Sequence, residues 1–257
     1  MQNCYFYDKF YDLMELVLKD GLIDGKYCFL GDFKYQTLTS EPQTIEINKH
    51  PKNYLIGYDS IRLTKNVRNA KKISTNAPIL SGLFNKFPYQ ISKSKNGDVF
   101  HSFSKTTEEK IQKLESILKD LKRDGVKGYD IVILSNYKLE NRNNFISNVN
   151  ISKYYQHIID LTDNNIRNLN ENLKELKKVN SIYFSTVNAF QGLESKIVIY
   201  VDPLENKDFS KNDIVSKPEL LAFNAMGRAN TYLYLLWDNR FKKYHDDKLE
   251  IIGKLSS

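Results

Sequence analysis

The sequence has few cysteines and no histidine cluster, and both absences restrict the class of protein. Cys4 and Cys28 are its two cysteines and lack a metal-ligand spacing, so we expect reduced thiols rather than a disulfide scaffold. The four histidines are scattered, so we predict no metal site in this chain. With 11 glycines and 6 prolines in 257 residues, the composition also excludes a collagen-like chain.

Long apolar segments are absent as well. No uncharged apolar run approaches the roughly 18 residues that cross a membrane, and the first residues lack the basic-then-apolar layout of a signal peptide. With 41% hydrophobic residues, a chain of this length can bury a sizeable core. We therefore expect a soluble, cytoplasmic, globular protein without a membrane partner.

The charge is moderately positive. There are 38 Lys and Arg residues against 31 Asp and Glu, which gives a net charge of +7. This excess fits a nucleic-acid or nucleotide partner. A Lys- and Asn-rich composition inherited from an AT-rich genome would produce the same charge, so both interpretations stay open.

Apolar periodicity alternates between strand and helix, which predicts an α/β fold with a mainly parallel sheet. The polar, proline-containing segment 37–58 predicts a boundary between residues 1–58 and a second domain at 59–257. The predicted strands are 27–30, 60–63, 99–103, 129–134, 182–187, 196–201 and 232–237. The predicted helices are 5–19, 69–80, 106–123 and 220–229, of which 106–123 has the clearest apolar face and a Thr106 cap.

Four segments combine glycine, amide and charged side chains at junctions between these elements. They are 31–36 (GDFKYQ), 63–69 (LTKNVRN), 185–194 (STVNAFQGLE) and 221–229 (LAFNAMGRA). Because ligands of open α/β sheets bind at the carboxyl ends of the strands, we expect the four segments at that edge. Each of the first, second and fourth also fits a plain structural role: a turn, a solvated arginine and an internal ion pair, respectively.

Together and in this order, the four segments resemble motifs III, IV, V and VI of the UvrD/Rep/PcrA-like superfamily 1 helicases. Residues 63–68 are similar to the family pattern L-x-x-N-[YF]-R, and 186–194 to T-[VIL]-H-x-x-K-G-L-E. Residues 223–229 are similar to Y-V-[AG]-x-[TS]-R-A. The resemblance implies a RecA-like, P-loop NTPase-type fold, with the tail of a first RecA-like domain followed by the second.

The sequence lacks the family's other two nucleotide motifs. It contains no G-x-x-x-x-G-K-[ST] segment and no Asp-Glu dipeptide, so Walker A and Walker B are both missing. We therefore expect the phosphate cradle and the Mg²⁺ carboxylate to lie in an N-terminal helicase half outside this chain. The chain alone is predicted not to hydrolyse ATP.

The resemblance also implies the roles of individual residues in a complete enzyme that uses ATP with Mg²⁺ and single-stranded DNA, with RNA left open. The implied γ-phosphate contacts are Gln36, Arg68 and Arg228, and the implied nucleotide contacts also include Gly192 and Glu194. The implied strand contacts are Tyr35, Thr186 and Asn188. Gly31 and Asp32 belong to motif III. The alternative is a non-catalytic adaptor built on a degenerate helicase domain.

Overall fold

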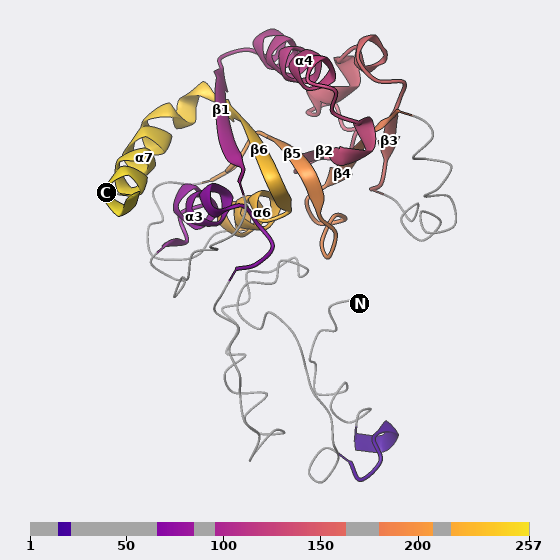
Figure 1. Ribbon diagram of the computed structural model, residues 1–257, viewed down its shortest axis with the longest axis vertical. Helices are drawn as coiled ribbons and strands as arrows, with labels where there is room; N and C mark the ends of the chain where they lie inside the picture. Colours follow the sequence, from indigo (N-terminus) through magenta and orange to yellow (C-terminus); the bar gives the residue numbers. More distant parts are fainter. Residues whose placement is uncertain (1–14, 22–65, 85–95, 163–179, 208–216, 257) are drawn as a thin grey trace. The chain divides into compact units, whose positions relative to one another are not determined.

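The computed structural model describes residues 15–21, 66–84, 96–162, 180–207 and 217–256 (Figure 1). The chain divides into two compact units, 1–63 and 64–257. Within the first unit, residues 15–17 are helical, and the rest of the predicted helix at 5–19 lies outside the described residues. The predicted strands at 27–30 and 60–63 and the segment 31–36 lie there too. The assignment of 1–58 to a first RecA-like domain therefore stays a prediction.

The second unit is built on a parallel sheet with the strand order β1-β6-β5-β2-β4-β3 (Figure 1). Every neighbouring pair of these strands is parallel, which confirms the predicted α/β class. The strands are β1 Asp98–Ser104, β2 Ile131–Ser135, β3 Ile158–Asp160, β4 Ile182–Thr186, β5 Ser195–Val201 and β6 Ala229–Asp238. β2 and β5 are nearly continuous β-branched runs because both of their faces are covered.

Helices cover both faces of the sheet (Figure 1). They are α3 Lys71–Leu80, α4 Thr107–Arg123, α6 Lys217–Met226 and α7 Lys242–Ser256. Short 3₁₀ turns lie at η3 Gly128–Asp130, η4 Phe145–Asn148, η5 Ile151–Lys153 and η6 Asn239–Phe241. α4 packs on one face with η4 and η5, whereas α3, α6 and α7 pack on the other.

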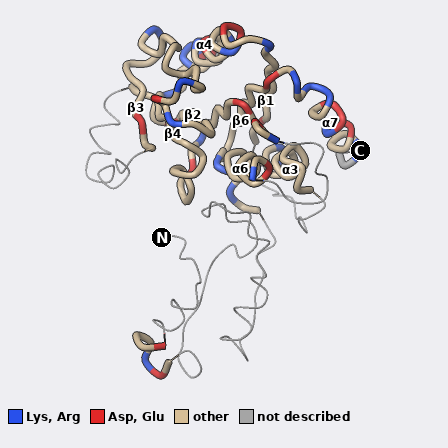
Figure 2. Tube along the Cα trace, turned by 180° about the vertical axis from the view of Figure 1, so that it is seen from behind, with Lys and Arg blue, Asp and Glu red and all other residues tan. Residues whose placement is uncertain are grey.

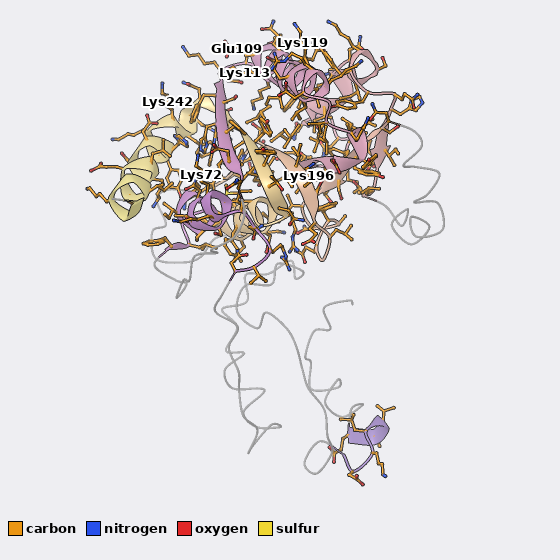
Figure 3. The ribbon with its side chains drawn as sticks, viewed as in Figure 1. Lys72, Glu109, Lys113, Lys119, Lys196 and Lys242 are labelled. Atoms are coloured by element: carbon orange, nitrogen blue, oxygen red, sulfur yellow. The ribbon has the colours of Figure 1, made fainter. Side chains whose placement is uncertain are left out.

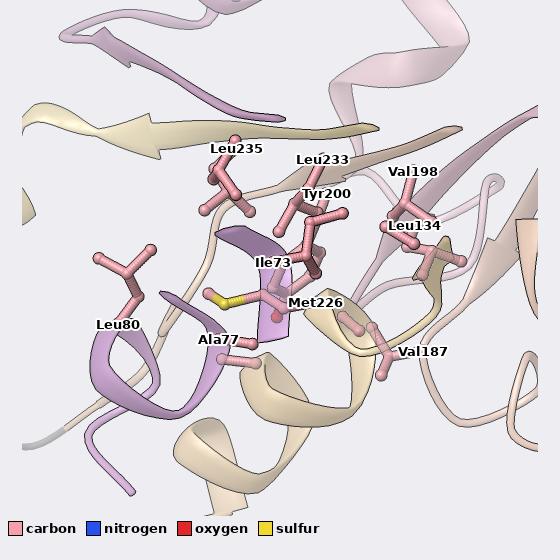
Figure 4. Packing of buried hydrophobic residues seen from close by; sticks show 14 of the residues in the cluster. Ile73, Ala77, Leu80, Leu134, Val187, Val198, Tyr200, Met226, Leu233 and Leu235 are labelled. Carbon is pink, nitrogen blue, oxygen red and sulfur yellow. The ribbon is translucent and has the colours of Figure 1, made fainter. Parts of the chain in front are cut away.

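The two faces of the sheet bury two separate apolar clusters, because alternate residues of each strand point to opposite sides. In β5, Val198 and Tyr200 join the cluster with α3 and α6, shown close up in Figure 4. Ile197 and Ile199 join the cluster beneath α4. The α3–α6 side fixes the two chain segments that carry Arg68 and Arg228, since each lies at an end of one of these helices.

The predicted helix at 106–123 is confirmed with its cap. The Thr106 side chain accepts a hydrogen bond from the backbone N–H of Glu109, which satisfies a donor of the first turn. Leu114, Leu118 and Leu121 are buried. Spacing and capping are local properties, and here they are sufficient to place the helix.

Other predicted boundaries differ from the structure. The strand predicted at 129–134 begins at Ile131, because residues 128–130 form a 3₁₀ turn. The helix predicted at 220–229 occupies Lys217–Met226 instead. Gly227 and Arg228 form the turn after it, and Ala229 already begins β6. Arg228 therefore lies in a helix-to-strand turn rather than inside a helix.

Candidate functional site

Three of the segments singled out in the sequence meet at one edge of the sheet. Glu194 immediately precedes β5, and Arg228 immediately precedes β6. These strands are neighbours, with Ser195 paired with Ala229, so the two residues enter the sheet side by side. Arg68 lies just before α3 and reaches the same edge. The edge holds the amino ends of β5 and β6, so the expectation that all these segments lie at the carboxyl edge is wrong.

The charged groups at this amino edge contact one another. Arg68 Nε lies 3.2 Å from Glu194 Oε2, and both side chains are about half exposed at 52%. Arg228 Nη1 lies 3.5 Å from the carbonyl oxygen of Leu193, a long and therefore weak hydrogen bond. The Arg68 guanidinium therefore contacts the Glu194 carboxylate, and the Arg228 guanidinium contacts the backbone of the residue before Glu194.

Arg228 occupies an unusual environment for a guanidinium. Burial lowers the pKa of Arg228, the positive charge of Arg68 lowers it further, and Glu194 opposes both effects. Two guanidinium groups therefore lie close enough to repel each other, and the one on Arg228 is partly desolvated. An added anion would relieve the repulsion between them, and the planar fork of arginine suits a phosphate oxygen pair.

Two lysines at the same end of the sheet already have carboxylate partners. Lys72 Nζ lies 2.7 Å from Asp98 Oδ2, and Lys196 Nζ lies 3.5 Å from Asp130 Oδ2. Both lysines are labelled in Figure 3. Elsewhere, basic and acidic residues are intermixed along α4 and α7 (Figure 2). The two lysines are thus paired with carboxylates other than Glu194.

Gly192 allows the turn before β5 to adopt a backbone conformation that other residues disfavour. Its φ is +86°, a conformation that side chains rarely adopt. A Cβ atom added there would meet nothing within 4 Å. Glycine is thus required by the turn rather than by a close neighbour, and the space in front of the peptide is open.

The structure does not bring the proposed strand contacts to the arginine pair. Thr186 ends β4 at the carboxyl edge, where its hydroxyl accepts a hydrogen bond from the backbone N–H of Ala189. Asn188 is exposed in the turn that follows. The segment 187–194 then returns to the amino edge at Glu194. Gly31, Asp32, Tyr35 and Gln36 lie outside the described residues.

One residue of this site escaped the sequence reasoning. Asn69 is buried next to Arg68, and its side-chain amide contacts the chain on both sides of Arg228. The sequence offers a weak signal: Asn69 is a polar amide just before the helix and next to Arg68. Its partners could not be deduced because they lie far away along the chain.

Two further observations concern metals and membranes. Among the described residues, no group of three or more His, Cys, Asp and Glu side chains is arranged to hold a metal ion. Within the same ranges, none of the helices combines the length and apolar character that a membrane crossing requires.

Comparison with known proteins gives similarities to solved structures only. No protein-family model and no curated protein sequence matches the chain. One similar structure is the C-terminal domain of a possible DNA helicase from Lactobacillus plantarum WCFS1, with 14% identity and a TM-score of 0.44 over 67% of this chain and 87% of that one. Another is the E. coli DEAD-box protein SrmB bound to regulator of ribonuclease activity A, with 13% identity and a TM-score of 0.36 over 58% of this chain and 81% of that one.

Proposed function

We propose that the chain is the C-terminal portion of an ATP-dependent, UvrD-like superfamily 1 DNA helicase. The observation that supports this proposal is the meeting of Arg68, Glu194 and Arg228 at one edge of the sheet. These residues come from three distant segments that resemble motifs IV, V and VI of the family. The neighbouring strands β5 and β6 bring Glu194 and Arg228 together, and the ion pair with Glu194 adds Arg68.

In the complete enzyme, the nucleotide lies against this edge. Arg68 and Arg228 contact the γ-phosphate, Glu194 accepts hydrogen bonds from the ribose, and the open space at Gly192 leaves room for the nucleotide. The arginines stabilise the charge that develops on the transferred phosphoryl group, which is electrostatic catalysis by preorganised donors. An N-terminal helicase half carrying Walker A and Walker B supplies the phosphate cradle and the Mg²⁺ ligands.

Single-stranded DNA lies at the opposite edge, on Thr186 and Asn188. The segment 187–194 begins beside these residues and ends at Glu194, so one short stretch of chain joins the strand contacts to the nucleotide contacts. A change in the position of Glu194 on ATP binding would therefore move the strand contacts. This coupling is what a translocating motor requires.

The first test is ATP turnover. The purified chain is expected to show none, and turnover is expected when a chain carrying Walker A and Walker B is added. Turnover by the purified chain that disappears in Arg228→Ala would contradict the division of the active site between two chains. Failure of the added chain to produce any turnover would favour the adaptor.

The second test is strand binding at several salt concentrations. The chain should bind single-stranded DNA weakly, with a log–log slope of about −0.7 per phosphate contacted. Asn188→Ala should weaken this binding, whereas Asn206→Ala, an exposed amide after β5, should not. Tight binding that is insensitive to salt would argue against a motor that slides along a backbone.

A further inference from the structure

The side-chain amide of Asn69 connects two chain segments that each carry an arginine. Asn69 is only 4% exposed. Its Nδ2 donates hydrogen bonds to the carbonyl oxygens of Gly227, at 2.9 Å, and Ala229, at 2.6 Å. These residues stand immediately before and after Arg228. A carbonyl oxygen only accepts hydrogen bonds, so the atom facing both must be the amide nitrogen, and both of its N–H groups are used.

The oxygen of the same amide organises the segment around Arg68. Asn69 Oδ1 accepts a hydrogen bond from Asn66 Nδ2 at 2.8 Å. Asn66 Oδ1 in turn accepts from the backbone N–H groups of Arg68, at 3.0 Å, and Asn69, at 3.1 Å. The Asn66–Asn69 pair therefore fixes the backbone at Arg68 while it holds the turn at Arg228.

Backbone hydrogen bonds complete this connection. Ala70 N–H donates to the carbonyl oxygen of Asn230 at 2.9 Å, and Ser195 N–H donates to that of Arg228 at 3.0 Å. The second bond ties the turn at Arg228 to the residue next to Glu194. Asn69 is the one side chain among these contacts that bonds to both flanks of Arg228.

A restraint is needed here because the two guanidinium groups repel each other. Burial and the charge of Arg68 both disfavour the charged form of Arg228, as its lowered pKa indicates. Without an anion, a flexible turn would let Arg228 move toward water. Two hydrogen bonds from a neutral buried amide oppose that movement without adding charge to the site.

We propose that Asn69 is a positioning residue that holds the Arg68 and Arg228 segments together as one preassembled phosphate receptor. The proposal rests on the proposed function in one respect, namely that the receptor serves a nucleotide. Asn69 itself contacts neither the nucleotide nor the reacting atoms. It acts through the backbone on either side of Arg228.

The chain offers a matched control in Asn144. This asparagine is 3% exposed, and its Nδ2 also donates to two carbonyl oxygens, those of Tyr137 and Lys138, each at 3.1 Å. It lies in the loop after β2, away from the arginines. Asn69→Ala and Asn144→Ala thus remove the same type of buried contact, and only the first should free Arg228.

The direct test is modification of arginines by phenylglyoxal in the full chain, with rates mapped residue by residue. Asn69→Ala should raise the rate at Arg228 by about tenfold, the effect of losing two hydrogen bonds of modest net strength. The rate at exposed Arg240 should not change. An unchanged Arg228 rate in Asn69→Ala, or an equal rise in Asn144→Ala, would overturn the proposal.

A measurement on the unmodified chain keeps the proposal testable if Asn69→Ala does not fold. In nuclear magnetic resonance spectra, the two Nδ2 protons of Asn69 should exchange with water much more slowly than those of exposed Asn188. Equally fast exchange would contradict a buried amide that uses both donors.

ATP binding by the folded variants separates this proposal from the proposed function. In the presence of a chain carrying Walker A and Walker B, the unmodified chain and Asn144→Ala should support equal ATP binding, and Asn69→Ala about tenfold weaker binding. If adding the unmodified chain leaves ATP binding by the Walker-containing chain unchanged while Asn69→Ala still frees Arg228, the positioning role stands and the nucleotide role falls. If ATP binds and Asn69→Ala changes neither readout, the positioning role falls.

Discussion

The charged residues at the two edges of the sheet lie in different surroundings. At the amino edge, Arg68 pairs with Glu194, and the charges of both residues act on the partly buried Arg228. At the carboxyl edge, Lys110 Nζ lies 2.5 Å from Asp202 Oδ1 and 3.6 Å from Asp238 Oδ2. Asp202, Asp238, Lys110 and Arg240 all act electrostatically on Glu205 in the same region.

The two edges also differ in how deeply their charged side chains are buried. Both Lys110 and Asp202 expose less than a sixth of their side chains, so their charges depend on each other rather than on water. Burial and the charge of Asp202 raise the pKa of Glu205 to about 7. At the carboxyl edge, where ligands of parallel sheets usually bind, Lys110 is therefore committed to its own ion pairs. At the amino edge, the half-exposed guanidinium of Arg68 and the nearby guanidinium of Arg228 have the planar shape that suits a phosphate.

The largest expected effect comes from removing the cation that defines the amino edge. In the complete enzyme, Arg228→Ala should lower the ATP turnover number by about 10³–10⁵, the value for an arginine that stabilises transition-state charge. Arg228→Lys should not restore it, because an ammonium group cannot reproduce the planar fork. Single-turnover rates per folded molecule provide the measurement.

The matched variant for that experiment is Arg240→Ala, which removes an arginine from the carboxyl edge. It should leave turnover unchanged. If Arg228→Ala lowers only the melting temperature, while the rate per folded molecule is retained, Arg228 is a structural residue and the two edges do not differ in function.

The second prediction concerns the buried ion pair of the carboxyl edge. Lys110→Met leaves Asp202 and Asp238 without their cation, so the free energy of unfolding should fall by about 3–5 kcal/mol, measured by urea denaturation. Arg68→Met breaks a half-exposed pair and should cost less than about 1 kcal/mol. Equal losses in the two variants would mean that the edges do not differ in burial.

The third prediction concerns the pH dependence of stability at His101, which lies in the middle of β1 and at neither edge of the sheet. Burial, together with the neighbouring His245, lowers the pKa of His101 to about 4. Trp237 Nε1 donates a hydrogen bond to His101 Nδ1, which protonation of that nitrogen would remove. The unfolded imidazole binds a proton near pH 6.5 and the folded one does not. Stability should therefore be full above pH 6.5 and fall as the pH decreases toward 4, by about 2 kcal/mol.

Urea denaturation between pH 4 and 8 measures this loss of stability. His101→Phe, which cannot take up a proton, should lose most of the dependence. Burial also lowers the pKa of His245, and Asp246 opposes that shift, so a smaller slope should remain. An unchanged slope in His101→Phe would assign the acid sensitivity to the carboxylates of the edges instead.

The smallest effect is expected from Glu205. Because its pKa is raised in the folded protein, its ionisation destabilises the fold progressively between about pH 4.5 and 7, and fully above pH 7. Glu205→Gln should therefore increase the free energy of unfolding at pH 8 relative to pH 5, by about 1 kcal/mol once solvent screening of this carboxylate is allowed for. A decrease at pH 8 would show that ionised Glu205 stabilises the carboxyl edge.

Much of the fold follows from local features of the sequence. Five of the six described strands are recognisable as apolar runs, and the helix at Thr107–Arg123 follows from its cap and apolar spacing. β3 and α7 were missed. β3 is short and only half buried, and the exposed face of α7 is highly charged, so neither produces a strong apolar pattern. A strand or helix produces a recognisable apolar pattern in the sequence only where many of its side chains are buried.

The sequence by itself also determined which residues carry charge at the candidate site, since the motif pattern alone identifies Arg68, Glu194 and Arg228. The apolar runs that follow Glu194 and Arg228 also indicate that each residue precedes a strand, which places both at the amino edge. Only the tertiary structure decided that β5 and β6 are neighbours and that Asn69 bridges the segments of both arginines. The physical reason is that strand order and long-range hydrogen bonds depend on how whole elements pack together, whereas periodicity and capping depend on residues a few positions apart.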